Sequence, residues 1–90
     1  MTNKPLISII TVCRNSEKTI EATILSVLNQ TYKNIEYIII DGDSTDSTKK
    51  IIEKYKNKIT HYISEKDDGL YYAFNKGIKY VSGEMFGFVN

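Results

Sequence analysis

The sequence predicts an α/β domain in which a mostly parallel β-sheet lies between two layers of helices. Apolar, β-branched segments of strand length alternate with longer segments whose apolar residues repeat at helical spacing. The alternation runs in the order β-α-β-α-β-α-β, which favours parallel strands joined by crossover helices. No repeat, linker or low-complexity segment interrupts it. Residues 1–90 are therefore expected to form a single domain.

The composition is that of a small globular protein. Ninety residues are near the lower limit for burying a stable core, and the hydrophobic content is 41%. Twelve basic and 11 acidic residues give a net charge of +1, which argues against nucleic acid as a partner. The single cysteine, Cys13, excludes an internal disulfide, so a cytoplasmic location is expected. Attachment at the inner face of the membrane through sequence outside this chain stays open.

Two buried strands are expected in the first half of the chain. Residues 6–12 (LISIITV) and 35–40 (IEYIII) are almost continuously apolar, as strands covered on both faces are. Residues 15–30 between them predict a helix that Asn15 or Ser16 caps. Its apolar face consists of Ile20, Ile24, Val27 and Leu28.

The next two elements are a helix and a more exposed strand. Residues 44–57 predict a helix that Ser44 or Thr45 caps, and lysines in its last turn suit the negative end of the helix dipole. Residues 59–64 (ITHYIS) alternate between apolar and polar side chains, which is typical of a half-buried strand.

The last part of the chain predicts where a ligand binds. Residues 69–83 predict a third helix, which Gly83 ends, and residues 85–90 begin a fourth strand. Right-handed crossovers place the carboxyl ends of all the strands at one edge of the sheet. The polar loops TVCRNSE, DGDSTDS and SEKDDGL meet at that edge together with Asn90. Ligands of open α/β sheets bind outside these strand ends.

The first two of these loops differ from known phosphate-binding loops. The first reads CRNSEKT instead of Gly-x-Gly-x-x-Gly, and the chain has no Gly-Lys-Ser/Thr. The second carries Asp41, Asp43 and Asp46. A carboxylate pairs well with a uracil imide or a ribose diol, and a diphosphate beside these acids needs Mg²⁺ or Mn²⁺. The pattern favours a metal-dependent nucleotide-sugar site over a simple strand-to-helix turn, although Asp46 is expected to cap a helix.

Four motifs together resemble the amino-terminal part of family 2 glycosyltransferases. They are ISIITVCRN, ATILSVLNQTYKNIEYIIIDGDSTDST, SEKDDGLYYAFNKGI and GEMFGFVN, in the family's order and spacing over residues 6–90. The resemblance implies the nucleotide-binding half of a truncated GT-A fold with strand order 3-2-1-4. It also implies inverting transfer of a hexosyl group from a nucleotide sugar, UDP-linked by expectation, to a hydroxyl acceptor. That acceptor would be a saccharide or a lipid-linked compound in cell-envelope polysaccharide or glycolipid synthesis.

The resemblance implies a set of nucleotide-binding residues in the three loops and the helix that follows them. The set is Thr11, Cys13, Arg14, Asn15, Asp41, Asp43, Asp67, Gly69 and Asn75. Thr11 matches the position that contacts the base in the family, and Asp41 matches the position that binds uracil or ribose.

The acidic motif departs from the family pattern. Many members read Asp-Asp-Gly-Ser-Thr-Asp, whereas this chain has Gly42 at the second acid and Asp43 after it. Either Asp41 or Asp43 can therefore hold the base, and Asp41 is favoured. Lys66 stands where relatives often have proline.

The sequence stops before the family's metal motif. In similar proteins Gly-x-x-x-Gly-Phe-x-Asn leads into Ser-Asp-Asp, the metal-binding acids, whereas this chain ends at Asn90. A divalent cation, Mn²⁺ or Mg²⁺, is therefore expected only in the full-length enzyme. No catalytic or metal-binding residue is expected in this chain, and the fragment is expected to be inactive alone.

Two alternatives belong to other functional classes. A receiver-like signalling module is also doubly wound, but CRNSE and SEKDDG replace the acid pair and the phosphorylatable aspartate that it needs. A non-catalytic assembly module would form a homodimer through the exposed edge of an incomplete sheet.

Overall fold

The computed structural model describes residues 4–66 and 69–89, which form a four-stranded sheet with three α-helices. The strands are β1 (Ile7–Cys13), β2 (Ile35–Asp41), β3 (His61–Ser64) and β4 (Met85–Phe88). The helices are α1 (Ile20–Leu28), α2 (Thr48–Lys54) and α3 (Leu70–Lys79), and a short 3-10 helix, η1 (Lys56–Lys58), follows α2. The strand order is β3-β2-β1-β4 and all neighbours are parallel, as predicted.

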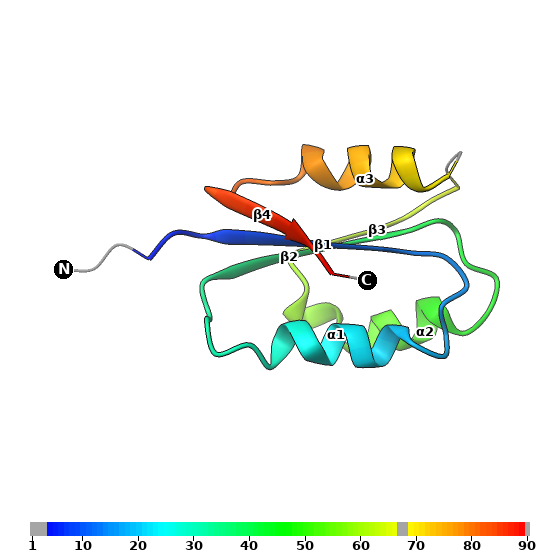
Figure 1. Cartoon of the computed structure of the whole chain (residues 1–90). Helices are drawn as coiled ribbons and strands as arrows, with labels where there is room; N and C mark the ends of the chain where they lie inside the picture. Colours follow the sequence, from blue (N-terminus) through cyan, green and yellow to red (C-terminus); the bar gives the residue numbers. More distant parts are fainter. Residues whose placement is uncertain (1–3, 67–68, 90) are drawn as a thin grey trace.

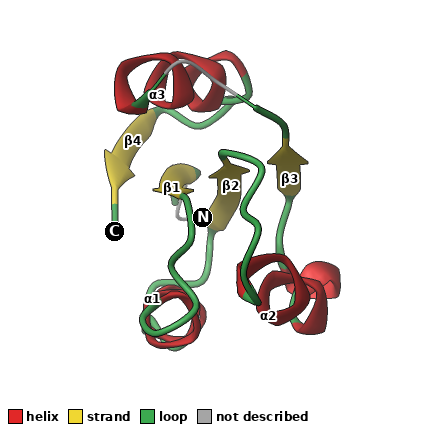
Figure 2. Ribbon diagram, turned by 90° about the vertical axis from the view of Figure 1, so that its right-hand side faces the viewer, coloured by secondary structure: helices red, strands yellow, loops and turns green. Residues whose placement is uncertain are grey.

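The sheet lies between two helical layers. Helices α1 and α2 cover one face, and α3 covers the other (Figures 1 and 2). Strands β1 and β2 occupy the centre of the sheet. This arrangement confirms the predicted α/β/α architecture. Within residues 4–66 and 69–89, every helix is too short or too polar to cross a membrane.

Alternation along β2 supplies both layers of the core. Tyr37 and Ile39 pack toward α1 and α2, whereas Ile38 and Ile40 pack toward α3, because successive strand residues face opposite sides. Each of the three isoleucines is completely buried. Burying one such side chain contributes roughly 1.5–3 kcal/mol. The continuous apolar sequence of β2 therefore reflects its central position.

Helices α1 and α2 begin later than the sequence predicts. α1 begins at Ile20 and α2 at Thr48, and neither N-cap residue makes a side-chain capping hydrogen bond. The capping roles predicted for Asn15 or Ser16 and for Ser44 or Thr45 are therefore wrong. Side chains in these two loops bond to the neighbouring loop instead.

Helix α3 ends at Lys79 and not at Gly83 as predicted. Gly83 instead donates its N–H to the hydroxyl of Ser8 at 3.0 Å. A Cβ atom at this position would lie 2.5 Å from the carbonyl oxygen of Leu6. The close approach of the α3–β4 connection to β1 therefore requires glycine.

Glu36 ties the amino end of β2 to this connection. Its side chain accepts hydrogen bonds from the Ser8 hydroxyl at 2.8 Å, the Ser82 N–H at 2.9 Å and the Ser82 hydroxyl at 2.5 Å. His61 Nε2 lies 4.0 Å from the same carboxylate. Burial opposes ionisation of Glu36, but the hydrogen bonds from Ser82 and Ser8 and the charge of His61 outweigh it, and the pKa is lowered.

Candidate functional site

Three loops meet at the carboxyl edge of the sheet, on the right-hand side of Figure 1. They follow β1, β2 and β3 and cover residues 14–19, 42–47 and 65–69. The strands end in register, with Cys13 opposite Asp41 and Asp41 opposite Ser64. The topology therefore brings most of the predicted binding residues to one edge.

The carboxylate of Asp41 lies at the centre of this edge and is completely buried. One oxygen accepts hydrogen bonds from the Ser44 hydroxyl at 2.5 Å and from the Cys13 thiol at 3.5 Å. The other accepts from the Ser44 N–H at 2.9 Å and the Ser64 hydroxyl at 2.8 Å. Four donors fill the acceptor positions of an ionised carboxylate. A ligand can bond to Asp41 only if it replaces one of them.

Asn15 clamps the first loop to the second. Its side-chain carbonyl accepts the N–H groups of Thr45 at 2.8 Å and of Asp46 at 3.4 Å, and its own N–H donates to the Ser44 hydroxyl at 2.7 Å. The clamp places Asn15 in a left-handed conformation, with φ of 49°, which asparagine tolerates better than most residues. Asn15 thus organises the site that it was predicted to join.

Further hydrogen bonds complete this unit. The N–H of Ser16 donates to the Thr48 hydroxyl at 2.7 Å, and the N–H of Glu17 donates to Asp46 at 3.2 Å. The N–H of Ser47 donates back to the Glu17 carboxylate at 2.9 Å. Asp46 also accepts the N–H of Thr48 at 2.9 Å, which satisfies a free donor at the start of α2. The two loops therefore behave as one hydrogen-bonded structure.

A pocket of about 130 Å³ lies between the end of β1 and α1. Its lining combines apolar groups with hydroxyls and consists of Thr11, Val12, Cys13, Ser16, Thr19, Ile20 and Thr23. An apolar cavity of about 150 Å³ admits a benzene molecule. The pocket is therefore comparable in size to one six-membered ring.

Thr11 and Cys13, two of the predicted binding residues, line this pocket and form hydrogen bonds with residues outside its lining. The Thr11 hydroxyl donates to the carbonyl of Val89 at 2.6 Å and lies 2.9 Å from the Tyr37 hydroxyl. Burial, followed by the charge of Asp41 and the hydrogen bond to it, raises the pKa of the Cys13 thiol far above its usual value. The thiol therefore stays protonated and acts as a donor to Asp41.

Asp43 differs from Asp41 in its exposure, its backbone conformation and its bonding partners. Its side chain is exposed, and its backbone is left-handed, with φ of 57°. The hydrogen bond from Lys49 at 2.5 Å is the main cause of its lowered pKa, and the charges of Lys49, Arg14 and Lys66 add to it. The charges of three cations thus act on one exposed carboxylate, and one of the three, Lys49, bonds to it directly.

The remaining predicted residues are more dispersed. Gly69 precedes α3 with φ of 120°, a conformation that favours glycine. Asn75 is exposed on α3 and makes none of the hydrogen bonds described above. Asp67 and Asn90 lie outside the described residues.

Two hydrogen-bond partners of Asp41, Ser44 and Ser64, were not predicted from the sequence. Ser44 stands three residues after Asp41, a spacing that allows an aspartate to accept its N–H in a local turn. That signal was available in the sequence. Ser64 was not identifiable in the same way, because its contact with Asp41 depends on the register between β2 and β3.

The described residues do not by themselves fit a divalent cation. Among residues 4–66 and 69–89, no group of three histidine, cysteine, aspartate or glutamate side chains is arranged to hold a metal. The oxygens of Asp41 are taken by hydroxyl, thiol and amide donors, and Asp43 is paired with Lys49. A divalent cation at this edge would need ligands from outside this set.

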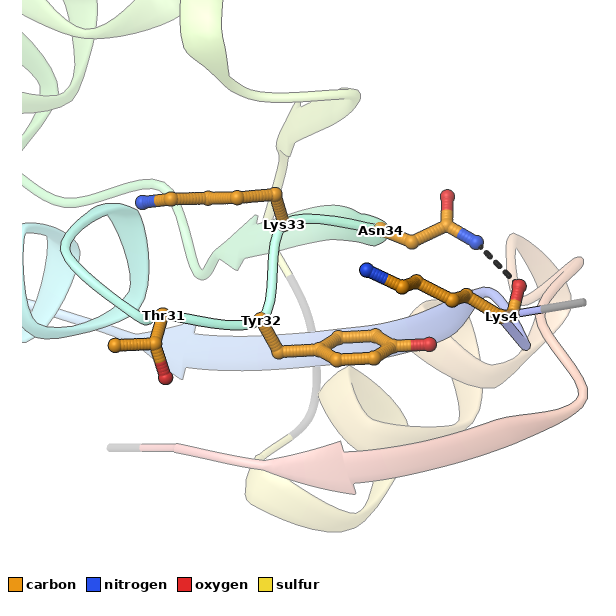
Figure 3. A pocket seen from close by; sticks show the side chains of 5 residues that line it. All are labelled: Lys4, Thr31, Tyr32, Lys33 and Asn34. Carbon is orange, nitrogen blue, oxygen red and sulfur yellow. Dashed lines mark hydrogen bonds between the residues drawn. The ribbon is translucent and has the colours of Figure 1, made fainter. Parts of the chain in front are cut away.

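A larger pocket, of about 560 Å³, lies at the opposite edge of the sheet. Figure 3 shows its lining, which comes from the chain before β1 and the turn before β2: Lys4, Thr31, Tyr32, Lys33 and Asn34. The Asn34 amide donates to the carbonyl of Lys4 at 2.7 Å and closes one side. None of the predicted binding residues lies there.

Comparisons with known proteins agree on the fold. The model of glycosyl transferase family 2 matches residues 8–90. The Escherichia coli protein UDP-Glc:alpha-D-GlcNAc-diphosphoundecaprenol beta-1,3-glucosyltransferase WfgD is 41% identical over 86 residues, which are 94% of this chain and 34% of that protein. This chain thus spans about a third of that relative's length.

Two solved structures superimpose closely. S. aureus TarS 1–349 in complex with UDP has a TM-score of 0.81 and 33% identity, covering 92% of this chain and 26% of that one. The mannosyltransferase PcManGT from Pyrobaculum calidifontis, in complex with GDP-Man and Mn²⁺, has a TM-score of 0.83 and covers 94% of this chain and 27% of that one. At 22% identity, the second likeness concerns the fold alone. Together they confirm the predicted GT-A architecture.

Proposed function

Because this chain belongs to glycosyl transferase family 2, we propose that it is the nucleotide-sugar-binding part of an inverting glycosyltransferase. The enzyme transfers a hexosyl group from a UDP-linked donor to a hydroxyl of a saccharide or lipid-linked acceptor in cell-envelope polysaccharide or glycolipid synthesis. Two relatives support the donor and the acceptor. WfgD is named for UDP-Glc and a diphosphoundecaprenol-linked sugar, and TarS was crystallised with UDP.

The hydrogen-bonded unit around Asp41, beside the pocket that Thr11 and Cys13 line, carries the proposal. A nucleobase entering this pocket meets a carboxylate whose weakest partner is the Cys13 thiol at 3.5 Å. A thiol is a weak donor, so an imide N–H can replace it on Asp41 at little cost. Ser44, with two bonds to the same carboxylate, keeps Asp41 oriented.

The chemical step is proposed to use residues outside this chain. In an inverting transfer a general base takes the proton of the acceptor hydroxyl, which then attacks the anomeric carbon in one displacement. The residues near the pocket bind and orient the nucleoside. The divalent cation and the catalytic base belong, in this proposal, to the longer enzyme, working in the cytoplasm at the inner face of the membrane. The 90-residue chain is therefore expected to bind nucleotide without transferring sugar.

Calorimetric titration of the chain with UDP and with GDP tests this proposal. We expect UDP to bind more tightly than GDP, because the pocket has the size of a single ring. Cys13→Met fills the pocket and should weaken UDP binding by about tenfold, which corresponds to 1.4 kcal/mol. Cys13→Ala removes the competing thiol without filling the pocket and should bind UDP at least as tightly as the wild type does.

Asp41→Asn provides a second test. It should weaken UDP binding in a chain that circular dichroism shows to be folded. A folded wild-type chain that binds no UDP at millimolar concentration contradicts the proposal. Binding that is indifferent to both Cys13→Met and Asp41→Asn contradicts the assignment of the pocket.

The edge of β4 favours self-association as a second function. β4 is the outermost strand on its side of the described sheet, and Phe86 and Phe88 are 50% and 42% exposed. Phe88 packs edge-on against Phe74, with ring centroids 4.5 Å apart. Pairing of two β4 strands would bury these rings in a homodimer. Sedimentation should show a dimer that Phe86→Lys dissociates, and a monomer at all concentrations would reject this function.

A further inference from the structure

Three cationic side chains from different elements flank the exposed side of the loop after β2. Lys49 belongs to α2 and contacts Asp43 directly at 2.5 Å. Arg14 follows Cys13, whose carbonyl accepts the N–H of Gly42 at 2.8 Å. Both Arg14 and Lys66 are close enough for their charges to act on the Asp43 carboxyl. One ion pair, two backbone hydrogen bonds between the loops and two longer-range charge interactions thus relate all three cations to Asp43.

Lys66 is brought there by the backbone of the third loop. The N–H of Glu65 donates to the carbonyl of Asp41 at 3.0 Å, which extends the pairing of β3 with β2 by one residue. The ammonium of Lys76 lies 3.4 Å from the carbonyl of Lys66 and 2.9 Å from the Glu65 carboxylate. The loop is therefore fixed on both sides of the point from which the Lys66 side chain leaves.

The other described acids of this edge form no ion pair with Arg14, Lys49 or Lys66. Asp46 accepts hydrogen bonds from backbone N–H groups, and Glu17 accepts the N–H of Ser47. Glu65 is paired with Lys76. Arg14 and Lys66 form no ion pair with any residue in the ranges 4–66 and 69–89. Among the described residues, Asp43 is therefore the only acid that bonds to one of these three cations, although the charge of the buried Asp41 also acts on Lys49.

We propose that Arg14, Lys49 and Lys66 form a cationic rim that binds the diphosphate of the nucleotide directly, and that Asp43 is its counter-ion in the free protein. This inference rests on the proposed function, because a nucleoside in the Thr11–Cys13 pocket brings its diphosphate to the same edge. A guanidinium binds phosphate oxygens through paired N–H groups, and ammonium groups act as point charges. The ligand replaces Asp43 on Lys49, and the carboxylate turns toward solvent.

The rim depends on Asp43 and Lys66, which are two of the positions at which this chain departs from the pattern of similar proteins. Asp43 is too exposed to gain much stability from its ion pair with Lys49, because solvent and salt screen exposed pairs. Replacement of Asp43 by a diphosphate on Lys49 therefore costs little free energy.

Titrations of the 90-residue chain with uridine, UMP, UDP and inorganic pyrophosphate, all in EDTA, test the rim. UDP should bind roughly tenfold more tightly than uridine, pyrophosphate alone should bind, and both effects should weaken as salt is raised from 0.05 to about 0.5 M. Arg14→Gln/Lys66→Gln should abolish pyrophosphate binding and remove the advantage of UDP, with uridine affinity unchanged. Lys33→Gln/Lys58→Gln removes the same charge at the opposite edge and should change nothing. Asp43→Asn removes the counter-ion and should raise pyrophosphate affinity about threefold.

The outcomes separate this inference from the proposed function. If uridine and UDP bind equally in EDTA, nucleoside recognition holds and the rim is refuted. If pyrophosphate binds through Arg14 and Lys66 while uridine does not bind, the rim holds and the proposed function fails. An advantage of UDP that survives Arg14→Gln/Lys66→Gln, or that the control pair removes equally, also overturns the rim.

Discussion

The two ends of β2 each bury a carboxylate, and the two are built differently. Glu36 at the amino end faces the α3 side, with Ile38 and Ile40, whereas Asp41 at the carboxyl end faces the side of α1 and α2. Both are nearly or fully buried, at 7% and 0% exposure. Each ties three segments of the chain together through hydrogen bonds.

The hydrogen-bond partners of the two carboxylates explain why only the carboxyl end of β2 is a candidate site. Glu36 binds Ser8 and Ser82 and fixes the α3–β4 connection against β1, with no described binding pocket among its partners. Asp41 is held by side chains from three strand ends, and one of them, Cys13, is both a weak donor and part of a pocket wall. The carboxylate of Glu36 thus stabilises the fold, whereas the carboxylate of Asp41 is also the proposed contact of a nucleobase.

Loss of the Asp41 carboxylate should have the largest effect on stability. Asp41→Ala leaves two hydroxyls, a thiol and an N–H without their buried acceptor, and unsatisfied buried groups cost about 1–3 kcal/mol each. We expect a loss of about 3–4 kcal/mol in the free energy of unfolding, measured by urea denaturation. Ser64→Ala removes one donor and should cost only about 1 kcal/mol. Equal losses for the two variants would show that Asp41 is not the centre of this edge.

Glu36→Gln should have a smaller effect that depends on pH. The folded protein lowers the pKa of Glu36, so the carboxylate contributes stability above its ordinary pKa, and this contribution is lost as the pH falls through the lowered value. At pH 7 the variant should be about 1–2 kcal/mol less stable than the wild type. The difference should shrink as the pH falls below about 4, which is near the ordinary glutamate pKa. A difference that is constant from pH 7 to pH 3 would contradict this account.

The smallest effect is expected at Asp43. Its left-handed conformation favours glycine, yet Gly42 beside it does not adopt a positive φ. Asp43→Gly removes the strain and loses only an exposed ion pair, so we expect a small gain in stability. Asp43→Ala loses the ion pair and keeps the strain, and it should be about 1 kcal/mol less stable than Asp43→Gly. Equal stabilities in thermal unfolding would show that the backbone here is unstrained.

Most of the fold was predictable because it depends on local patterns. The apolar runs that became β1 and β2, and the alternation of strands with helices, predicted the layers, whereas the strand order was implied by the family resemblance. The helix starts were predicted wrongly at Asn15 and Ser44, because the same polar side chains that cap helices can also bond to a neighbouring loop. Whether these side chains cap a helix or bond to the other loop depends on the distance between the two loops, which cannot be derived from the sequence alone.

The placement of the candidate residues at one edge of the sheet was predictable, but their contacts were not. The position of Asp41 at a strand end followed from the pattern, and its convergence with Cys13 followed from parallel topology. Its complete burial did not, because that depends on Ser64 from a strand more than 20 residues away. The grouping of Arg14 and Lys66 around Asp43 likewise needs the loops in three dimensions.

The central position of β1 has a kinetic consequence. β1 is the first of the described strands to be synthesised, yet one of its edges pairs with β4, so that Ile7 lies opposite Met85. At a synthesis rate of about 5–20 residues per second, β1 waits roughly 4–15 seconds for this partner. Until then its backbone offers an open row of N–H and C=O groups to any other extended chain. One edge of β1 in the nascent chain therefore stays unpaired until the last described strand, β4, is available.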